Sequence, residues 1–120
     1  MPNKAYAFLD GKQIPIEEAK VGVMTHALHY GTAVFEGIRG NWNAAEGKMY
    51  IFRLREHYER LKRGCEILRI SLPYDVDELC SITINLLERN GFREDVYIRP
   101  LAFKGQEAVA NLKLNELDDQ

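Results

Sequence analysis

The chain has 120 residues, of which 46% are hydrophobic and 28% are charged, and its formal net charge is −2. These values are ordinary for one globular domain, and they exclude both a basic surface for nucleic acid and a highly charged disordered chain. The N-terminus lacks the apolar core of a signal peptide, and no apolar run approaches the ~20 residues of a membrane span. We therefore expect a cytoplasmic protein with neither nucleic-acid nor membrane partners.

The N-terminal part of the chain reads as a hairpin followed by a loop. Two short extended segments, Ala5–Leu9 and Gln13–Ile16, flank Asp10-Gly11, a pair that favours the positive φ angles of a tight turn. Residues 17–20 form a polar connection. Residues 21–32 mix glycine, histidine and tyrosine without clear periodicity, which predicts an ordered loop with one helical turn.

Two further strands are expected before the chain becomes helical. Ala33–Arg39 and Met49–Leu54 are short segments with several apolar and aromatic residues. The polar segment Gly40–Gly47 between them reads as a turn region. We therefore expect the two strands to pair antiparallel, as neighbouring strands joined by a turn commonly do.

The period of the apolar residues becomes helical from Arg55. One stripe follows intervals of three and four residues: Tyr58, Leu61, Cys65 and Leu68. Ser71-Leu72-Pro73 ends this helix. Cys65 and Cys80 form no Cys-x-x-Cys pair and both lie among helical residues, so reduced core thiols are the simplest interpretation.

A second helix carries clear start and stop signals. Asp75 and Glu78 have the spacing of a capping box, in which each side chain satisfies an otherwise unpaired backbone N–H, and Gly91 supplies the stop. Asp95–Phe103 then reads as a strand. Pro100 inside it indicates an edge position or a bulge, because proline cannot donate a hydrogen bond to a neighbouring strand.

The order of these elements predicts an α+β domain with a mostly antiparallel sheet and two helices packed on it. The last residues contain three leucines in a polar stretch that stops without a structural terminator: Leu112, Leu114 and Leu117. We therefore expect the chain to be a fragment of a longer protein.

The strand at 33–39 carries the first candidate binding residues. Alternation along a strand puts Phe35, Gly37 and Arg39 on one face. An aromatic ring, a bare backbone position and a guanidinium suit a ligand with an apolar part and an anionic part. Periodicity alone favours the plainer interpretation, in which Phe35 is core, Gly37 is a bulge and Arg39 reaches solvent.

The strand at 95–103 repeats this pattern. Tyr97 and Arg99 are two residues apart and share a face, where a guanidinium fork and a hydroxyl can bind one carboxylate or phosphate. The alternative is a tyrosine half-packed at a sheet edge beside a solvated arginine. This motif alone favours that alternative.

Arginines also mark the start of the first helix. Arg53 and Arg55 stand where positive charge opposes the helix dipole unless an anion binds there, which hints at a phosphate site. The plainer interpretation is a salt bridge to Glu56 or Glu59, or solvation. His26 and His29 are three apart but have no third ligand nearby, so we expect no metal site and predict hydrogen bonds from both to the loop backbone.

Together and in order, these segments resemble a known family. His26–Gly31 followed by Val34–Arg39, then Phe52–His57 with Arg60-Leu61, and finally Tyr97–Leu101 resemble the motifs of branched-chain amino-acid aminotransferases. These are pyridoxal 5′-phosphate enzymes with the D-amino-acid-aminotransferase-like fold, fold type IV. The resemblance covers nearly all of the chain, and Val34–Arg39 argues for branched-chain substrates.

The resemblance implies roles for individual residues. Arg53 resembles the arginine that binds the cofactor phosphate, whereas Arg55 stays unassigned. Six further residues resemble substrate-binding positions: Arg39, Tyr97 and Arg99 around the substrate carboxylates, Phe35 and Gly37 in the wall of the aliphatic pocket, and Tyr30 on a loop that reaches the neighbouring subunit. The last of these implies a homodimer.

The resemblance also implies what this chain lacks. Residues 1–120 resemble the N-terminal small domain of the family, and the Schiff-base lysine lies in the domain that follows it. None of the lysines here matches that lysine, so we expect the 120 residues alone to be inactive. Asn111 stands where many relatives have valine in a Gly-Val pair, which leaves exact substrate preference open. Alternatives are a D-amino-acid aminotransferase or aminodeoxychorismate lyase of the same fold type, or a non-catalytic binding or dimerisation module.

Overall fold

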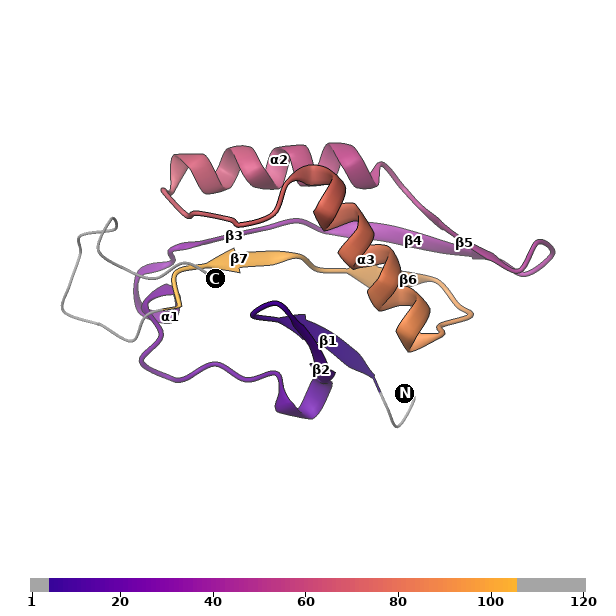
Figure 1. Cartoon of the computed structure of the whole chain (residues 1–120), viewed down its shortest axis with the longest axis horizontal. Helices are drawn as coiled ribbons and strands as arrows, with labels where there is room; N and C mark the ends of the chain where they lie inside the picture. The colour runs from indigo at the N-terminus through magenta and orange to yellow at the C-terminus, as the bar shows by residue number, and fades with distance from the viewer. Residues whose placement is uncertain (1–4, 106–120) are drawn as a thin grey trace.

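The computed structural model describes residues 5–105 and confirms the α+β class (Figure 1). Within this range the elements follow one another in this order: β1 (Tyr6–Leu9), β2 (Lys12–Pro15), the short 3-10 helix η1 (Ile16–Glu18), α1 (His26–Tyr30), β3 (Ala33–Phe35), β4 (Ile38–Asn43), β5 (Lys48–Ile51), α2 (Leu54–Ile67), α3 (Val76–Asn90), β6 (Val96–Ile98) and β7 (Leu101–Phe103). All described strand pairs are antiparallel.

The N-terminal hairpin forms as its turn residues predict. Asp10 and Gly11 have φ angles of 51° and 82°, and β1 pairs with β2 on either side of them. Asn90 at the end of α3 holds the hairpin, because its amide accepts from the Tyr6 N–H at 2.8 Å and donates to the Tyr6 carbonyl at 3.1 Å. The single helical turn expected in the following loop is α1, which ends at Gly31 with φ 68°.

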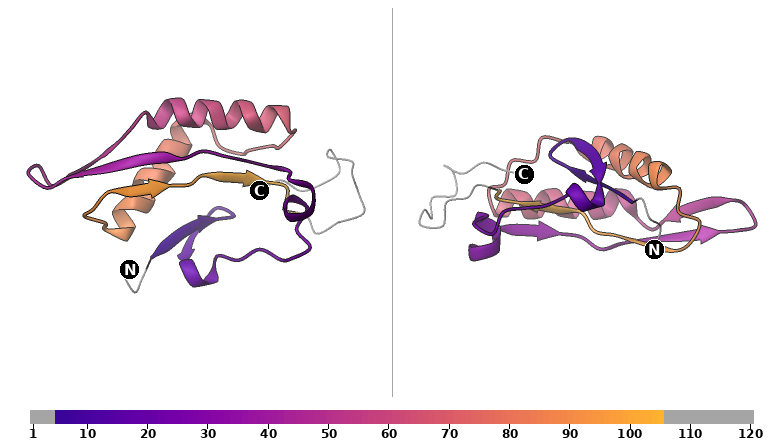
Figure 2. Two further views of the ribbon diagram at one scale, coloured as in Figure 1. Left: turned by 180° about the vertical axis from the view of Figure 1, so that it is seen from behind. Right: turned by 90° about the horizontal axis from the view of Figure 1, so that it is seen from below.

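A long two-stranded ribbon runs through the centre of the domain (Figure 2). β4 pairs with β6 and β3 pairs with β7, and Ile38 faces Ile98 as Phe35 faces Leu101. The same number of residues separates these pairs on both strands, so the register continues past Pro100 without a bulge. The edge position predicted for Pro100 is confirmed, since β6 and β7 are outer strands of the described sheets.

The predicted strand bounds need three corrections. Neither Ala33–Arg39 nor Asp95–Phe103 is one uninterrupted strand, because Pro100, which lies opposite Glu36, has no N–H for the ladder. The first segment divides into β3 and β4, and the second into β6 and β7. The predicted turn at Gly40–Gly47 starts too early. β4 runs on to Asn43, and a Cβ on the buried Gly40 would lie 2.7 Å from Val96, so this glycine serves close packing within the strand rather than the turn.

The third correction concerns the end of β5. The predicted strand Met49–Leu54 ends at Ile51, and α2 begins at Leu54, one residue before the expected start. The N-cap residue Arg53 has φ 51° and ψ 46°, the left-handed conformation that non-glycine residues seldom adopt. This turn sends the chain from the sheet directly into the helix.

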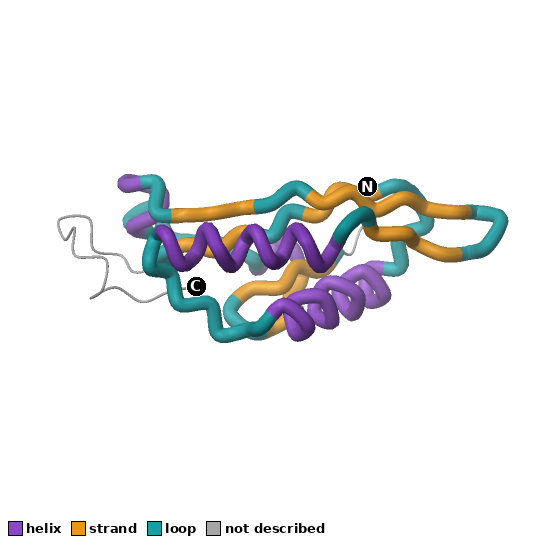
Figure 3. The backbone as a smooth tube through the Cα atoms, turned by 90° about the horizontal axis from the view of Figure 1, so that it is seen from above, coloured by secondary structure: helices purple, strands orange, loops and turns teal. Residues whose placement is uncertain are grey.

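Helices α2 and α3 cover one side of β4 and β5 (Figure 3). The apolar stripe predicted for α2 lies in the core, with Tyr58, Leu61 and Cys65 at most 4% exposed, against the fully buried Ile38. Gly64 lets α2 approach the sheet closely, because a Cβ there would lie 3.1 Å from Val34. The predicted start and stop of α3 are confirmed by the capping box of Asp75 and Glu78 and by Gly91, which has φ 65°.

The opposite side of the ribbon is covered by neither α2 nor α3, and the short helix α1 lies at its end (Figure 2). Seen from behind, the strands from β3 to β5 lie in front of α3 (Figure 2, left). Burial alternates accordingly, because Glu36 and Ile38 are buried on the helix side whereas Phe35 and Arg39 are exposed. The fold thus leaves one sheet face open.

Candidate functional site

The exposed side of the ribbon gathers most of the predicted binding residues. We call this surface the open face. It is defined by seven residues of paired strand positions: Phe35, Gly37, Arg39, Phe52, Tyr97, Arg99 and Leu101. The four large apolar or aromatic side chains among them are 52% to 66% exposed. Such a patch, with two arginines set among its rings, is typical of a surface that binds a ligand or another protein.

Gly37 makes room for Tyr97. A Cβ built on Gly37 would lie 1.9 Å from the Tyr97 hydroxyl oxygen, so the phenol ring lies directly over this position. The cross-strand partner of Tyr97 is Arg39. The interpretation of Gly37 as a bulge is therefore wrong. Glycine stands at this position because the Tyr97 ring approaches the backbone closely, and only glycine leaves space for a neighbouring side chain over the strand.

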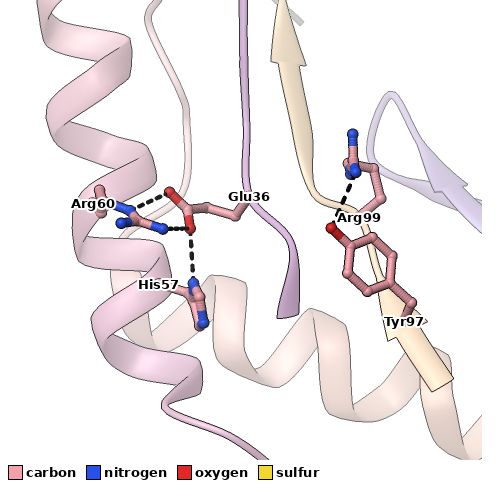
Figure 4. A network of polar contacts seen from close by, with 5 residues as sticks. All are labelled: Glu36, His57, Arg60, Tyr97 and Arg99. Carbon is pink, nitrogen blue, oxygen red and sulfur yellow. Dashed lines mark hydrogen bonds and ion pairs between the residues drawn. The ribbon is translucent and has the colours of Figure 1, made fainter. Parts of the chain in front are cut away.

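Arg99 joins the aromatic rings of the open face. Its Nη2 donates to the Tyr97 hydroxyl at 3.1 Å (Figure 4). Its guanidinium lies 4.3 Å from the centre of the Phe35 ring. Stacking on aromatic rings orients the planar guanidinium and leaves donors available at its edge. The plainer interpretation of Phe35 as core is wrong, because its side chain is 58% exposed.

Arg53 lies at the border of the same face. The Phe52 N–H donates to the Arg39 carbonyl at 2.9 Å, which extends the β4–β5 ladder by one bond, and the Arg53 guanidinium lies 5.5 Å from the centre of the Phe52 ring. Arg53 is the N-cap residue of α2, and its side chain does not cap the helix. Arg55 instead forms an ion pair with Asp77 of α3, a partner that the sequence interpretation did not name.

The two arginines of the open face, and Arg53 at its border, have no acidic partner in the part of the chain that the structure describes. The ion pairs found there involve Arg55, His57 and Arg60, and none includes Arg39, Arg53 or Arg99. Guanidinium groups beside aromatic rings and a tyrosine hydroxyl are a donor set that suits carboxylates. The open face can therefore bind an anion next to an apolar group.

Glu36 is a polar residue that the sequence interpretation left without a role. It is 5% exposed on the helix side, where its carboxylate accepts from Arg60 Nε at 2.8 Å, Arg60 Nη2 at 2.7 Å and His57 Nδ1 at 2.7 Å (Figure 4). The Arg60 hydrogen bond lowers the pKa of Glu36 against the opposing effect of burial, and His57 lowers it further. A charge at a core-facing strand position was the available signal.

The histidine loop lies beyond the start of β3. His29 Nε2 donates to the Val23 carbonyl at 2.8 Å, as predicted, whereas the partner of His26 Nδ1 is a side chain, the Thr32 hydroxyl at 2.9 Å. Tyr30 is 40% exposed and its ring packs 4.5 Å from that of His26. Tyr30 is thus on α1, at the end of the ribbon, apart from the strand positions of the open face (Figure 1).

Metal-binding clusters are absent from the described part of the chain. Residues 5–105 contain no group of three or more His, Cys, Asp or Glu side chains that could hold a metal ion. None of the helices in this range is long and apolar enough to cross a membrane. The position of Asn111, and the end of the chain from Leu112 onward, lie outside the described residues.

Known sequences similar to this chain point to one family. The sequence profile of a family described as amino-transferase class IV matches residues 33–116. A probable branched-chain-amino-acid aminotransferase of Aquifex aeolicus is 50% identical over 98 residues, which cover 82% of this chain and 32% of that protein. The branched-chain-amino-acid aminotransferase of Salmonella typhimurium is 42% identical over 83% of this chain and 31% of its own length. The chain spans about a third of the length of these curated relatives.

Solved structures give the same result for the fold. A branched-chain aminotransferase from Thermoproteus uzoniensis, solved with norvaline, has a TM-score of 0.89 and 40% identity, over 97% of this chain and 38% of its own. The enzyme from Thermobaculum terrenum in its PLP form has a TM-score of 0.84 and 42% identity, over 98% and 38%. A T.th. branched-chain amino acid aminotransferase, complexed with N-(5′-phosphopyridoxyl)-L-glutamate, has a TM-score of 0.80 and 41% identity, over 91% and 35%.

Proposed function

The chain belongs to the class IV aminotransferase family, and from this premise we propose that it is the domain of a branched-chain amino-acid aminotransferase that holds the substrate carboxylates and the cofactor phosphate. The complete enzyme moves an amino group between leucine, isoleucine or valine and 2-oxoglutarate. One observation carries the proposal. Arg39, Tyr97 and Arg99, from two paired strands, stand on one open face without an acidic partner among the described residues.

The open face offers contacts for both kinds of substrate side chain, the aliphatic one of leucine and the carboxylate of glutamate. The Arg99 fork and the Tyr97 hydroxyl, held 3.1 Å apart, can donate together to the second carboxylate of glutamate or 2-oxoglutarate, which leucine lacks, and Arg39 adds positive charge from the neighbouring strand. Phe35 and Gly37, the latter with the Tyr97 ring over it, form an apolar wall for an aliphatic side chain. The relatives solved with norvaline and with a phosphopyridoxyl glutamate support a site that accepts both kinds of side chain.

The start of α2 fits a phosphate. No side chain of the described residues caps this helix of 14 residues, so its first N–H groups and the Arg53 guanidinium form a set of donors next to the positive end of the helix dipole. We assign Arg53 to the phosphate of pyridoxal 5′-phosphate, which when bound supplies the electron sink that amino transfer requires. The relative in its PLP form supports this assignment.

We assign the covalent attachment of the cofactor to a lysine outside these 120 residues. Within the described part, Lys62 donates to the Tyr74 carbonyl at 2.5 Å and Lys104 donates to the Arg69 carbonyl at 2.7 Å, both on the helix side of the sheet. Neither amine is directed to the open face. We propose that the 120 residues bind and orient substrates but do not transfer amino groups by themselves.

The loop that carries Tyr30 supports a homodimer. Its neighbours Val23 and Leu28 are 79% and 62% exposed, so the loop presents apolar groups around the half-exposed tyrosine. Exposed apolar groups of this kind favour association with another protein surface. We propose that this surface is the neighbouring subunit, and that Tyr30 reaches the substrate site of that subunit.

A comparison of substrates tests the proposed function. The full-length protein encoded by the gene, supplied with pyridoxal 5′-phosphate, is expected to convert L-leucine and 2-oxoglutarate to glutamate, and the 120 residues alone are not. Preference for D-alanine or for aminodeoxychorismate would assign the chain to another member of the fold type. A full-length protein that neither turns over any of these compounds nor binds the cofactor would support the non-catalytic module instead.

A further inference from the structure

The buried carboxylate of Glu36 lies directly behind the open face. Figure 4 shows Glu36 extending to α2 while Tyr97 and Arg99 lie on the adjacent strand. Arg60 binds both carboxylate oxygens, at 2.7 and 2.8 Å, and His57 binds one of them at 2.7 Å. We call these three residues the Glu36 clamp. A buried charge costs desolvation free energy, and apolar residues of equal volume often give equal stability, so its benefit can lie in geometry.

We infer that Glu36 is a positioning residue: through the clamp it fixes the start of α2, and with it Arg53, relative to the strands that bear Arg39, Tyr97 and Arg99. This inference rests on the proposed function, because it assigns the phosphate to Arg53 and the substrate carboxylates to the strands. It adds a reason why the phosphate-binding start of α2 and the substrate-binding strands keep a fixed distance and orientation.

The helix side of the clamp leads directly to Arg53. The His57 N–H donates to the Arg53 carbonyl at 3.0 Å, the first hydrogen bond of α2. The imidazole of the same residue donates to Glu36. His57 therefore connects the N-cap residue to the strand through one backbone bond and one side-chain bond. Arg53 has a left-handed conformation although it is not a glycine. Such a strained turn depends on contacts from the surrounding structure, such as those of His57.

The strand side of the clamp leads to the substrate-binding residues. The Glu36 N–H donates to the Pro100 carbonyl at 3.1 Å, so the residue that binds α2 is also tied to the strand carrying Arg99. Its two chain neighbours, Phe35 and Gly37, face the opposite way, under Arg99 and Tyr97 respectively. A shift of Glu36 therefore moves Phe35 and Gly37, and with them the surface that the Arg99 and Tyr97 side chains contact.

The bidentate geometry distinguishes the clamp from ordinary packing. Apolar contact between α2 and the strand already exists near the other end of the helix, where Gly64 meets Val34. Apolar contact is non-directional, whereas a guanidinium fork on a carboxylate fixes distance and orientation together. Loss of the clamp is therefore expected to weaken cofactor and substrate binding strongly while it lowers the stability of the fold only slightly.

The test uses the full-length protein and a Glu36→Gln variant, which keeps the shape of the side chain but removes its charge. Glu59→Gln makes the same change on the exposed side of α2 and serves as the matched control. Asp75→Ala removes the cap of α3, away from the open face, and controls for a loss of thermal stability. The measured quantities are the dissociation constant of pyridoxal 5′-phosphate, kcat and KM for leucine, and Tm.

The inference predicts that Glu36→Gln weakens cofactor binding and lowers kcat/KM by ~10-fold or more, because small displacements of binding groups cost that much. Both controls are expected to stay within about twofold of the wild type. Arg60→Gln changes a side chain that is 66% exposed, and we expect it to show the same losses. The double variant is expected to show no larger ones, because both residues act as one unit.

Three results separate this inference from its premise. If Glu36→Gln loses no more affinity or kcat/KM than Asp75→Ala at the same loss of Tm, the clamp is merely structural and the inference is wrong. Additive losses in the double variant would also contradict it. If the wild-type protein binds the cofactor and only Glu36→Gln and Arg60→Gln weaken that binding, but leucine is not a substrate, the branched-chain activity fails while the positioning role stands.

Discussion

Gly37 and Tyr97 show how one missing side chain organises the open face. The sequence predicts a bare backbone position at Gly37, whereas the Tyr97 hydroxyl occupies the space over this glycine. Sequence alternation correctly placed Phe35, Gly37 and Arg39 on one face. It could not show that Tyr97 lies on top of them, since the pairing of residues 39 and 97 depends on a contact between distant parts of the chain.

We predict that Gly37→Ala lowers kcat/KM for leucine by ~10-fold to ~100-fold with little change in Tm. The added Cβ would lie 1.9 Å from the Tyr97 hydroxyl, and this exposed ring can swing away at the cost of its bond to Arg99. In a Tyr97→Ala background the same substitution has nothing to displace and should change little further. Steady-state kinetics of the two single variants and the double variant measure this, and independent, additive effects would count against it.

Arg99 is expected to discriminate between the two substrates. We predict that Arg99→Lys raises KM for 2-oxoglutarate by ~10-fold while KM for leucine changes by less than about threefold, because lysine has neither the planar fork nor the stacking on Phe35. Arg93→Lys, an exposed arginine away from the open face, is the matched control. An equal rise of KM for both substrates would show that Arg99 does not read the second carboxylate.

Glu36 gives the domain a pH dependence with a definite sign. Because the Arg60 and His57 bonds lower its folded pKa below the ordinary 4.5, its contribution to stability is present above that ordinary value and is lost as pH falls through the lowered one. We predict that the free energy of unfolding falls on acidification below about pH 4.5, and that Glu36→Gln makes this fall shallower. Urea unfolding at a series of pH values measures the slope, and identical slopes in both proteins would refute the assignment.

At the scale of elements, the sequence correctly predicts those turns and helix ends that depend on neighbouring residues alone. The Asp-Gly turn, the capping box at Asp75 and the stop at Gly91 depend on residues a few positions apart, and each lies where the sequence predicted it. The ends of β5 and α2 were misplaced because the left-handed turn at Arg53 involves no glycine or proline. We infer that tertiary contacts, the hydrogen bond of His57 to Glu36 among them, stabilise that turn.

The cap of α3 allows a direct test of these local signals. We predict that Asp75→Ala lowers the free energy of unfolding by ~1 kcal/mol, because the Glu78 N–H loses its acceptor at 2.7 Å. In a full-length protein this corresponds to a fall in Tm of roughly 2–4 °C. Differential scanning calorimetry measures it. Asp95→Ala alters an exposed aspartate that accepts from the Trp42 backbone, outside any helix, and an equal effect there would remove the special role of the cap.

At the scale of the whole molecule, the fold is long and thin, with principal extents of 53 × 30 × 18 Å, and both α2 and α3 lie on the same side of the described ribbon (Figure 3). Local patterns gave the kind and order of the elements and the antiparallel class. They could not give the pairing of β3 with β7 and β4 with β6, since these strands are separated by both helices in the sequence. That pairing assembles the open face. Before the structure, only the resemblance to the aminotransferase family indicated that the binding residues of these strands lie together.

The open face is expected to bind the substrate while the start of α2 binds the cofactor phosphate. A crystal structure of the full-length protein with pyridoxal 5′-phosphate and glutamate tests this assignment most directly. We predict a phosphate within hydrogen-bond distance of Arg53 and a glutamate carboxylate bound by Arg99 and Tyr97. A cofactor and ligand bound elsewhere, with Arg39, Tyr97 and Arg99 in contact with neither, would contradict it.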